Sequence, residues 1–246
     1  MKKVITLIGI LLIASQVIGQ NILKEKFHKG LVLYLHSFDE VNDSSPARQE
    51  VQVKGGVTKN KDFVNFDGRS GLLFVDSDLG LRSKLITLSF SVKVPSAFEA
   101  GPFVMIGGYR NGFAVGVGED SFDAKGNHVI VEYNNSQIMV SSKKLKPNVW
   151  HTILLVIDRN GSPVLYVNNS KDQRLGHKKS RKFVQPQTGD GSGIHIGGCE
   201  YRYKRSANYY NFVKKYTRCS IDNVAIFNNT ISGVVKSELA KISKKQ

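Results

Sequence analysis

Hydrophobic and polar residues alternate most regularly between Ile86 and Val94. Apolar side chains occupy every second position of this stretch, and Thr, Ser or Lys fill the positions between them. Because successive side chains of a β-strand point to opposite faces, the pattern predicts a strand with one face in a core and the other in solvent. Further apolar or alternating runs predict the remaining strands: Leu31–Leu35, Leu72–Val75, Phe103–Ile106, Phe113–Val117, Val129–Tyr133, Gln137–Val140, Trp150–Ile157, Val164–Val167, Ile194–Ile196 and Ile221–Phe227.

Turn-forming dipeptides such as Asn111-Gly112 and Asn160-Gly161 separate nearly all of these runs. Many short strands without helices between them favour an all-β fold, a two-sheet antiparallel β-sandwich. Trp150–Ile157 is apolar on both faces, so we expect it in the interior of a sheet. One short helix is predicted at the C-terminus, where Ser232 can cap it and apolar residues recur at helical spacing.

The first residues have the composition of a secretory leader. Two lysines precede an apolar run from Val4 to Ile13, and small residues follow up to Gly19. The run is too short to cross a bilayer, so the pattern predicts a signal peptide over residues 1–19 and a single domain over residues 20–246. We therefore expect export by the signal peptide to the periplasm, the cell surface or the extracellular space.

The chain is strongly basic, with 35 Lys and Arg, 20 Asp and Glu and a formal net charge of +15. Loss of the leader would remove Lys2 and Lys3 and leave +13. In an exported protein, such a field concentrates polyanions, among them acidic polysaccharides, lipid headgroups and DNA. Charge alone does not distinguish these partners. We expect no specific nucleic-acid recognition and no membrane span.

The segment between Cys199 and Cys219 has the most unusual composition in the chain. Its 19 residues hold five tyrosines, one phenylalanine, six Lys or Arg and a single acid, Glu200. Tyr supplies contact area at modest entropic cost, and Arg and Lys pair with carboxylate, sulfate or phosphate groups. Two cysteines in an oxidising compartment are expected to pair, and a disulfide between Cys199 and Cys219 would close the segment into a loop.

We therefore predict that this loop binds acidic, ring-bearing ligands, most readily acidic polysaccharides. The alternative is a solvated loop without a ligand. The predicted ligand-binding residues are Tyr201, Arg202, Tyr203, Lys204, Arg205, Tyr209, Tyr210, Lys214, Lys215 and Arg218. A second basic segment, Lys171 to Lys182, is expected to be a long loop. It is either a solvated face without a ligand or an auxiliary part of the binding surface, through Lys178, Lys179, Arg181 and Lys182.

Several segments resemble, in the same order, the laminin-G-like jelly rolls of the concanavalin A-like lectin and glucanase superfamily. The family's opening strand and turn are similar to GLVLYLHSFDEVNDSSP, and its Phe-Asp-Gly turn and long alternating strand to FVNFDGRSGLLFVDSDLGLRSKLITLSFSVKV. The Trp-His strand and hairpin of the family are similar to NVWHTILLVIDRNGSPVLYVNN, a short strand to SGIHIGG, and the closing strand and helix to CSIDNVAIFNNTISGVVKSEL. The resemblance covers roughly residues 30 to 242. It implies a binding module, often for carbohydrate and sometimes for a cell-surface protein.

The resemblance also implies a structural calcium ion near the first turn and the last strand. Asp39, Asp43 and Asp222 occupy positions that correspond to the family's carboxylates, and backbone carbonyls would complete the oxygen shell. Many relatives carry a second Asp where this chain has Asn223, which removes one charge from the site. The alternative is that Asp39 and Asp43 form turns and that Asp222 lies at a sheet edge.

Catalysis has weaker support in the sequence, and we predict no catalytic residue. Glycoside hydrolases on this fold carry Glu-x-Asp-x-Glu on one strand, whereas the acids of VDSDLG and GEDSFDAKG lie in turn sequences. A polysaccharide lyase would use a His, a Tyr and basic residues, but the order of His195 and the Tyr-rich segment differs from that family's. A protein-binding adhesion module is the first alternative to carbohydrate binding, and a lyase or glycoside hydrolase the second.

Overall fold

The computed structural model describes residues 30–77, 85–97, 99–107, 112–119, 124–133, 137–157, 163–172, 174–175, 193–206 and 209–229. Within these ranges, no side chain is described for residues 112, 133, 137–138, 174–175, 201–206 and 209–213. All the predicted strands are present in the described part, and none of its residues is helical. It contains no helix that could span a membrane. The predicted signal peptide and C-terminal helix lie outside it.

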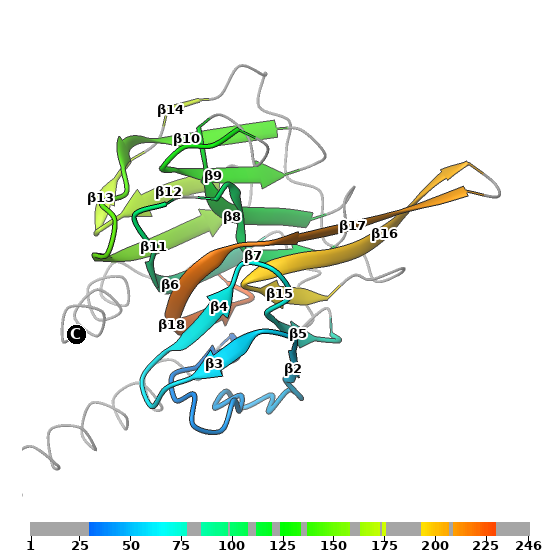
Figure 1. The fold of residues 1–246 in the computed structure, drawn as a ribbon. Coiled ribbons are helices and arrows are strands. Elements are labelled where there is room, and N and C mark those ends of the chain that lie inside the picture. Colours follow the sequence, from blue (N-terminus) through cyan, green and yellow to red (C-terminus); the bar gives the residue numbers. More distant parts are fainter. Residues whose placement is uncertain are drawn as a thin grey trace, which may run out of the picture.

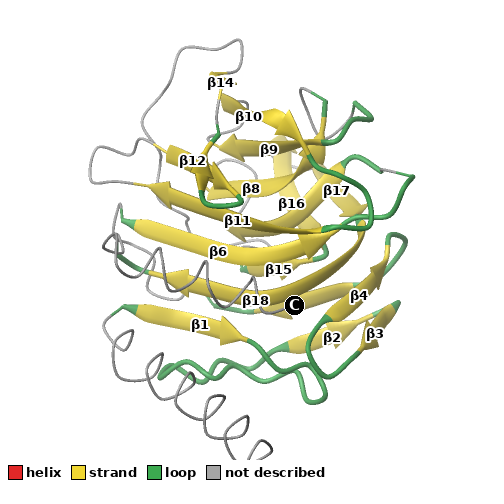
Figure 2. Cartoon of the chain, turned by 90° about the vertical axis from the view of Figure 1, so that its left-hand side faces the viewer, coloured by secondary structure: helices red, strands yellow, loops and turns green. Residues whose placement is uncertain are grey.

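Two eight-stranded antiparallel sheets form the sandwich (Figures 1 and 2). Sheet A contains β1 (Leu31–Leu35), β3 (Val57–Lys59), β4 (Val64–Asp67), β6 (Ile86–Lys93), β11 (Trp150–Ile157), β12 (Pro163–Val167), β13 (Ser170–Lys171) and β18 (Arg218–Phe227). Sheet B contains β2 (Gln52–Lys54), β5 (Leu72–Val75), β7 (Gly101–Gly107), β8 (Gly112–Gly118), β9 (His128–Tyr133), β10 (Gln137–Lys144), β14 (Arg174–Leu175) and β15 (Ile194–Ile196). A separate hairpin contains β16 (Gly198–Ser206) and β17 (Tyr209–Tyr216). The predicted two-sheet sandwich is confirmed.

The strand order places β6, β11 and β18 in the interior of sheet A. The order in sheet A is β13-β12-β11-β6-β18-β4-β3, with β1 also paired to β18, and that in sheet B is β14-β10-β9-β8-β7-β15-β5-β2. The interior position predicted for Trp150–Ile157 is therefore confirmed. β18 pairs with β6 on one side and with β4 and β1 on the other.

The core lies between the sheets and takes one face of each alternating strand. In β6, the core face carries Ile86, Leu88, Phe90 and Val92, none more than 1% exposed. The opposite face is also buried, and its residues Thr87, Ser89 and Ser91 are at most 4% exposed. The prediction that this face is solvated is wrong, because the cross-strand neighbours on it are largely apolar. Ser89, for example, lies between Leu154 and Ala225.

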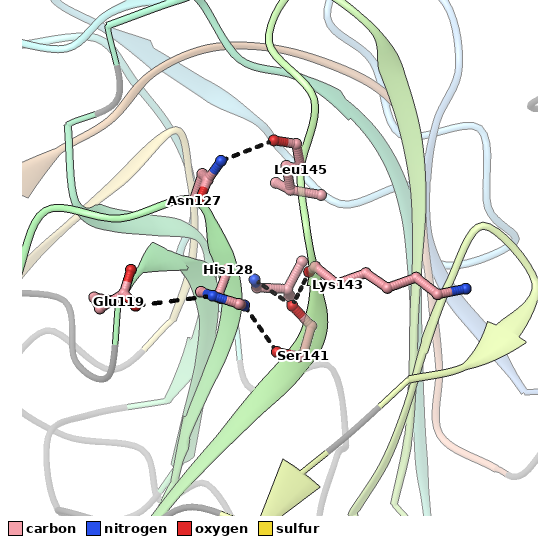
Figure 3. A network of polar contacts seen from close by, with 7 residues as sticks. Glu119, Asn127, His128, Ser141, Lys143 and Leu145 are labelled. Atoms are coloured by element: carbon pink, nitrogen blue, oxygen red, sulfur yellow. Dashed lines mark hydrogen bonds and ion pairs between the residues drawn. The ribbon is translucent and has the colours of Figure 1, made fainter.

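A polar network stabilises an irregularity in β10, where its register with β9 shifts between Val140 and Lys144. The hydroxyl of Ser141 donates to the carbonyl of Lys143 at 2.7 Å and accepts the N–H of Val129 at 2.9 Å. His128 Nδ1 lies 2.9 Å from the carbonyl oxygen of Ser141, so this nitrogen carries the proton (Figure 3). The network satisfies backbone groups that the shifted register leaves unpaired.

Asp172 ties the edge of sheet A to this irregular part of sheet B. The residue directly follows β13 and is 4% exposed. Its carboxylate accepts the N–H of Ser142 at 2.8 Å and that of Lys143 at 3.2 Å. A buried carboxylate is tolerated only when such donors surround it, so these two hydrogen bonds join the sheets at this edge.

The chain passes from sheet B to sheet A through the hairpin, and Gly197 begins this passage. Its φ of +88° is left-handed, and a Cβ at this position would lie 2.1 Å from Cδ1 of Phe66, so the turn requires glycine. The carbonyl of Gly197 accepts the N–H of Thr217 at 2.9 Å. The Thr217 hydroxyl donates to the carbonyl of Pro102 at 2.8 Å. These bonds hold the two ends of the hairpin against sheet B.

The predicted disulfide between Cys199 and Cys219 is wrong, because both cysteines are free and buried. Cys199 lies opposite Lys215 in the hairpin, and Cys219 lies four residues further along the chain, in β18 opposite Phe66. Four extended residues span about 13 Å, whereas bridged cysteines have Cα atoms within about 7 Å of each other. The spacing of two cysteines in a sequence does not reveal this strand register.

We predict that both thiols stay unmodified in the folded protein. Burial raises the pKa of Cys199 to about 12 and also raises that of Cys219, so neither is a thiolate at neutral pH. A thiol reagent is expected to label neither cysteine under native conditions and both in guanidinium chloride, without prior reduction, as counted by intact-mass spectrometry. A requirement for reductant before labelling in guanidinium chloride would show a disulfide and contradict the structure.

Candidate functional site

The basic and aromatic segment forms a long two-stranded ribbon instead of the predicted loop. β16 and β17 pair from Gly198, opposite Tyr216, to Ser206, opposite Tyr209. Figure 1 shows this pair extending away from the sandwich. The order Tyr-Arg-Tyr-Lys from position 201 suits a strand, because Tyr has a high β-propensity and the period of two separates the two residue types. We call this β16–β17 hairpin the ribbon.

The ribbon places the predicted ligand-binding residues at paired positions of one small sheet. The cross-strand partners are Tyr201 with Val213, Arg202 with Phe212, Tyr203 with Asn211, Lys204 with Tyr210, and Ser206 with Tyr209. Arg205 lies where the register shifts between Lys204 and Ser206. Lys214 pairs with Glu200, Lys215 pairs with Cys199, and Arg218 lies beyond the ribbon at the start of β18.

Glu200, the single acid of the segment, is neutralised at the base of the ribbon. The Tyr216 hydroxyl donates to Glu200 Oε1, and Lys214 Nζ lies 3.5 Å from the same oxygen. Partial burial raises the pKa of Glu200, but the Tyr216 hydrogen bond and the Lys214 charge outweigh it and lower the pKa below its ordinary value. Glu200 is therefore an anion that is balanced within the ribbon. It does not oppose an anionic ligand as a free carboxylate would.

Arg218 lines an open pocket on sheet A, beside the base of the ribbon. The pocket has a volume of about 360 Å³, near the lower end of the range for small-molecule sites. It lies over the ends of β3, β4 and β6 and the start of β18. These four strands are consecutive in sheet A, in the order β6-β18-β4-β3. Its polar lining consists of Thr58, Asn65, Asp67, Lys93, Asn148 and Arg218, together with Ser220. We call it the sheet A pocket.

Among the described residues that line this pocket, Asp67 is the only one with a carboxylate. Its Oδ1 accepts the N–H groups of Arg69, Ser70 and Gly71 at 2.8–2.9 Å, and its Oδ2 accepts the Ser70 hydroxyl at 3.1 Å. Slight burial raises the pKa of Asp67, but these hydrogen bonds prevail and lower it to about 2. The carboxylate is thus committed to the turn that follows β4.

Asp43, a predicted calcium ligand, is surrounded by hydrogen-bond donors. Its Oδ1 accepts the N–H groups of Tyr34 and Ser45, each at 2.8 Å. Its Oδ2 accepts the Ser45 hydroxyl at 2.7 Å and the N–H of Gln49 at 2.8 Å. Donors of this kind favour the alternative in which Asp43 organises a turn. Asp39, by contrast, is exposed.

Asp222, another predicted calcium ligand, is 1% exposed and lies at a bulge in β18. The backbone N–H and the side-chain amide of Asn223 donate to its two oxygens at 2.6 and 2.7 Å. Asn223, which marks a departure from the resembled family, therefore serves this carboxylate directly. No group of three or more His, Cys, Asp or Glu within the described ranges could hold a metal ion. The donors around Asp43 and Asp222 occupy the carboxylate oxygens that a calcium ion would need, so they do not fit a calcium site. Calcium binding stays a prediction.

Two side chains considered for catalysis, Glu119 and His195, have structural partners. Glu119 Oε1 lies 3.9 Å from His128 Nε2, in the network of β9 and β10 (Figure 3). His195 is 1% exposed, accepts the N–H of Glu200 at Nδ1 (3.3 Å) and packs 5.0 Å from the Phe74 ring. Asp76 directly follows β5, whereas Asp78, Asp120 and Asp123 lie outside the described residues, as do Lys178, Lys179, Arg181 and Lys182.

Sequence reasoning missed Lys93, Trp150 and Phe63, which lie together beside the sheet A pocket. Lys93 and Trp150 are cross-strand partners in sheet A. A signal was present, because Lys93 is the last polar position of the alternating strand and Trp150 is the first residue of another predicted strand. The pairing of those two strands was not available from the sequence.

No protein-family model matches the chain, and no curated protein matches it. Solved structures with a similar fold exist. The receptor-binding domain of botulinum neurotoxin C/D mosaic serotype is 15% identical over 88% of this chain and 51% of that chain, with a TM-score of 0.58. The binding domain of Paraclostridial Mosquitocidal Protein 1 is 15% identical over 88% and 52%, with a TM-score of 0.59. Trypanosoma rangeli sialidase is 15% identical over 87% and 32%, with a TM-score of 0.61.

These similarities concern the fold. The chain spans about half of each toxin chain and about a third of the sialidase chain. They agree with the two antiparallel sheets seen here and support the jelly-roll sandwich. The more specific likeness to laminin-G-like domains remains a resemblance in sequence.

We predict that Asp43→Ala destabilises the protein to the same extent with and without calcium. The variant leaves the N–H groups of Tyr34, Ser45 and Gln49 without their acceptor, which should cost about 3 kcal/mol of unfolding free energy. Urea unfolding in EDTA and in millimolar calcium measures this. If the wild type gains stability from calcium and Asp43→Ala abolishes that gain, the carboxylate binds the ion.

We predict that Asp222 makes stability depend on pH between about 4 and 7. Burial raises the pKa of Asp222, and Asp62 raises it further, to about 7 in spite of the Asn223 hydrogen bonds. The folded state therefore holds a proton that the unfolded carboxyl, with a pKa of about 3.9, releases. This contribution is complete below about pH 4 and is lost as the pH rises through about 7.

Asp222→Asn should remove this loss, because an amide does not titrate in this pH range. Its oxygen can still accept the Asn223 N–H, so the local structure is kept. The wild type is expected to lose stability relative to the variant between pH 5 and pH 8 in urea unfolding. Parallel profiles for the two proteins over this interval would contradict the assignment.

Proposed function

We propose that this chain is an exported, non-catalytic carbohydrate-binding module that prefers acidic polysaccharides and contacts them through the ribbon. The observation that carries the proposal is the projecting ribbon, which concentrates Tyr, Lys and Arg and has its single acid neutralised. The contact residues are those predicted from the sequence, Tyr201, Arg202, Tyr203, Lys204, Arg205, Tyr209, Tyr210, Lys214, Lys215 and Arg218.

A paired ribbon suits this function better than a loop. Cross-strand hydrogen bonds fix the backbone before binding, so less conformational entropy is lost when a ligand binds. Along β16, the basic and tyrosine positions alternate, and residues two positions apart are about 6.6 Å apart. A linear polyanion that lies along the ribbon therefore meets positive charges at regular intervals.

Proteins of similar fold support a sugar ligand. The binding domain of Botulinum Neurotoxin DC, 13% identical with a TM-score of 0.59, was solved in complex with SialylT. The Trypanosoma rangeli sialidase was solved with 2,3-difluorosialic acid, an acidic sugar. Together with the strongly basic composition of this chain, these ligands favour acidic glycans over neutral ones.

We predict that the triple variant Arg202→Ala, Lys204→Ala, Arg205→Ala elutes from heparin and from immobilised pectin at lower salt than the wild type. Removal of three cations from the contact surface should reduce the slope of log affinity against log salt by about 2–3. The matched control replaces the exposed Lys59, Lys61 and Lys144 with Ala. It changes the net charge equally and should elute close to the wild type.

Equal shifts in the two triple variants would show that only net charge matters and would contradict the ribbon assignment. Absence of retention of the wild-type protein at low salt would overturn polyanion binding and favour a protein partner. New ultraviolet absorbance during incubation with pectin would reveal unsaturated sugar ends, and therefore a lyase.

A further inference from the structure

Lys93 ends β6 beneath two aromatic rings and lines the sheet A pocket. Its Nζ lies 5.1 Å from the centroid of the Trp150 ring and 5.3 Å from that of Phe63. The two rings pack edge to face, with centroids 5.7 Å apart. The two distances from Lys93 Nζ to the ring centroids fall within the range of cation–π attraction, so the rings hold the ammonium group in a defined place.

Neither Lys93 nor Arg218 forms an ion pair within the described part of the chain. Asp67 lies opposite Arg218 in the register, but its oxygens accept three backbone N–H groups and one hydroxyl. The described lining of the pocket therefore holds two cations and one carboxylate that is already satisfied. The Glu99 carboxylate lies near Gly68 and Arg218, outside this lining. Such a pocket attracts an anionic group from solution.

Strand register brings the two cations to the same side of sheet A. Lys93 lies opposite Ser220, and Arg218 lies two residues before Ser220 in β18. Diagonal neighbours of this kind have Cβ atoms about 7–8 Å apart. Because both side chains are long, one carboxylate or sulfate group between them can reach both.

Side-chain amides supply groups suited to sugar hydroxyls in the same pocket. Asn65 Oδ1 accepts the Ser220 hydroxyl at 2.5 Å, so its amide nitrogen points the other way and can donate. Asn148 uses its amide nitrogen toward Ser96 at 3.4 Å, which leaves its oxygen to accept. The pocket thus presents a donor and an acceptor beside its two cations.

We propose that the sheet A pocket binds one acidic sugar unit, a uronic acid or a sulfated pyranose. Lys93 and Arg218 pair with its carboxylate or sulfate, and Asn65 and Asn148 bind its hydroxyl groups. Thr217 joins the ribbon directly to Arg218, so a polysaccharide on the ribbon would place one unit in the pocket. In this respect the inference deepens the proposed function and rests on it, but the pocket can be tested with short oligosaccharides.

Trp150 is the only tryptophan in the chain, so its fluorescence reports on this pocket. The folded protein is titrated with trigalacturonate, with a heparin-derived tetrasaccharide and with neutral maltotriose. A saturable change with at least one acidic oligosaccharide and none with maltotriose is expected. The two acidic probes distinguish a carboxylate from a sulfate ligand. A response to maltotriose as strong as to the acidic probes, or no response to any probe, would overturn the proposal.

Two variants then test the cations by isothermal titration calorimetry with the acidic probe that binds. Lys93→Met keeps a long apolar chain against the two rings and removes the charge, and we expect about tenfold weaker binding or more. Arg218→Gln is expected to weaken binding similarly. Lys144→Met, at an exposed lysine in β10, is the matched control and should stay within about twofold of the wild type. Thermal unfolding checks that each variant is folded.

The outcomes for the pocket and the ribbon are distinguishable. If Lys93→Met and Lys144→Met bind the acidic oligosaccharide equally well, the pocket proposal is wrong even where the ribbon still retains polymers. If the oligosaccharide binds and depends on Lys93 while the ribbon triple variant keeps full heparin retention, the ribbon assignment fails and the pocket stands.

Discussion

The crossing of the chain from sheet B to sheet A at Thr217 determines where the two proposed binding surfaces lie. The backbone N–H of Thr217 bonds to Gly197 and its hydroxyl bonds to Pro102, so both ends of the ribbon are held at one place on sheet B. The next residue, Arg218, begins β18 between β4 and β6. The ribbon and the sheet A pocket are therefore neighbours because the same short connection ends one and begins the other.

Electrostatic balance differs between the acids and the two cations of the sheet A pocket. Buried acids such as Asp43 and Asp172 are surrounded by N–H and O–H donors, which offsets the cost of removing them from water. Glu200 is paired with Tyr216 and Lys214. The acids thus stabilise the fold locally, whereas Lys93 and Arg218 have no such partner in the described part of the chain.

The strands were predictable because their residues alternate or are continuously apolar. Trp150–Ile157 and Ile194–Ile196 have in the structure the bounds that the sequence indicated. The ribbon was misjudged as a loop because its alternation is between Tyr and basic residues, which hydrophobic periodicity does not detect. The disulfide prediction failed for a related reason. The sequence does not show that Cys199 pairs with Lys215 in the ribbon while Cys219 pairs with Phe66 in sheet A.

The site was less predictable than the fold because it depends on contacts between distant strands. The basic segment could be found from composition, but the cluster of Lys93, Trp150 and Phe63 depends on the pairing of β6 with β11. The solvated face expected for β6 was wrong for a similar reason, because burial of Ser89 is decided by Leu154 and Ala225 on the neighbouring strands.

Asp172 protects one edge of sheet B from pairing with a strand of another molecule. β14 covers β10 only at Met139 and Val140, so the backbone of Ser142 and Lys143 lies at an edge that another strand could extend. Their N–H groups already donate to the Asp172 carboxylate. An incoming strand would find these donors occupied and a negative charge beside them, which guards the edge against aggregation by strand addition.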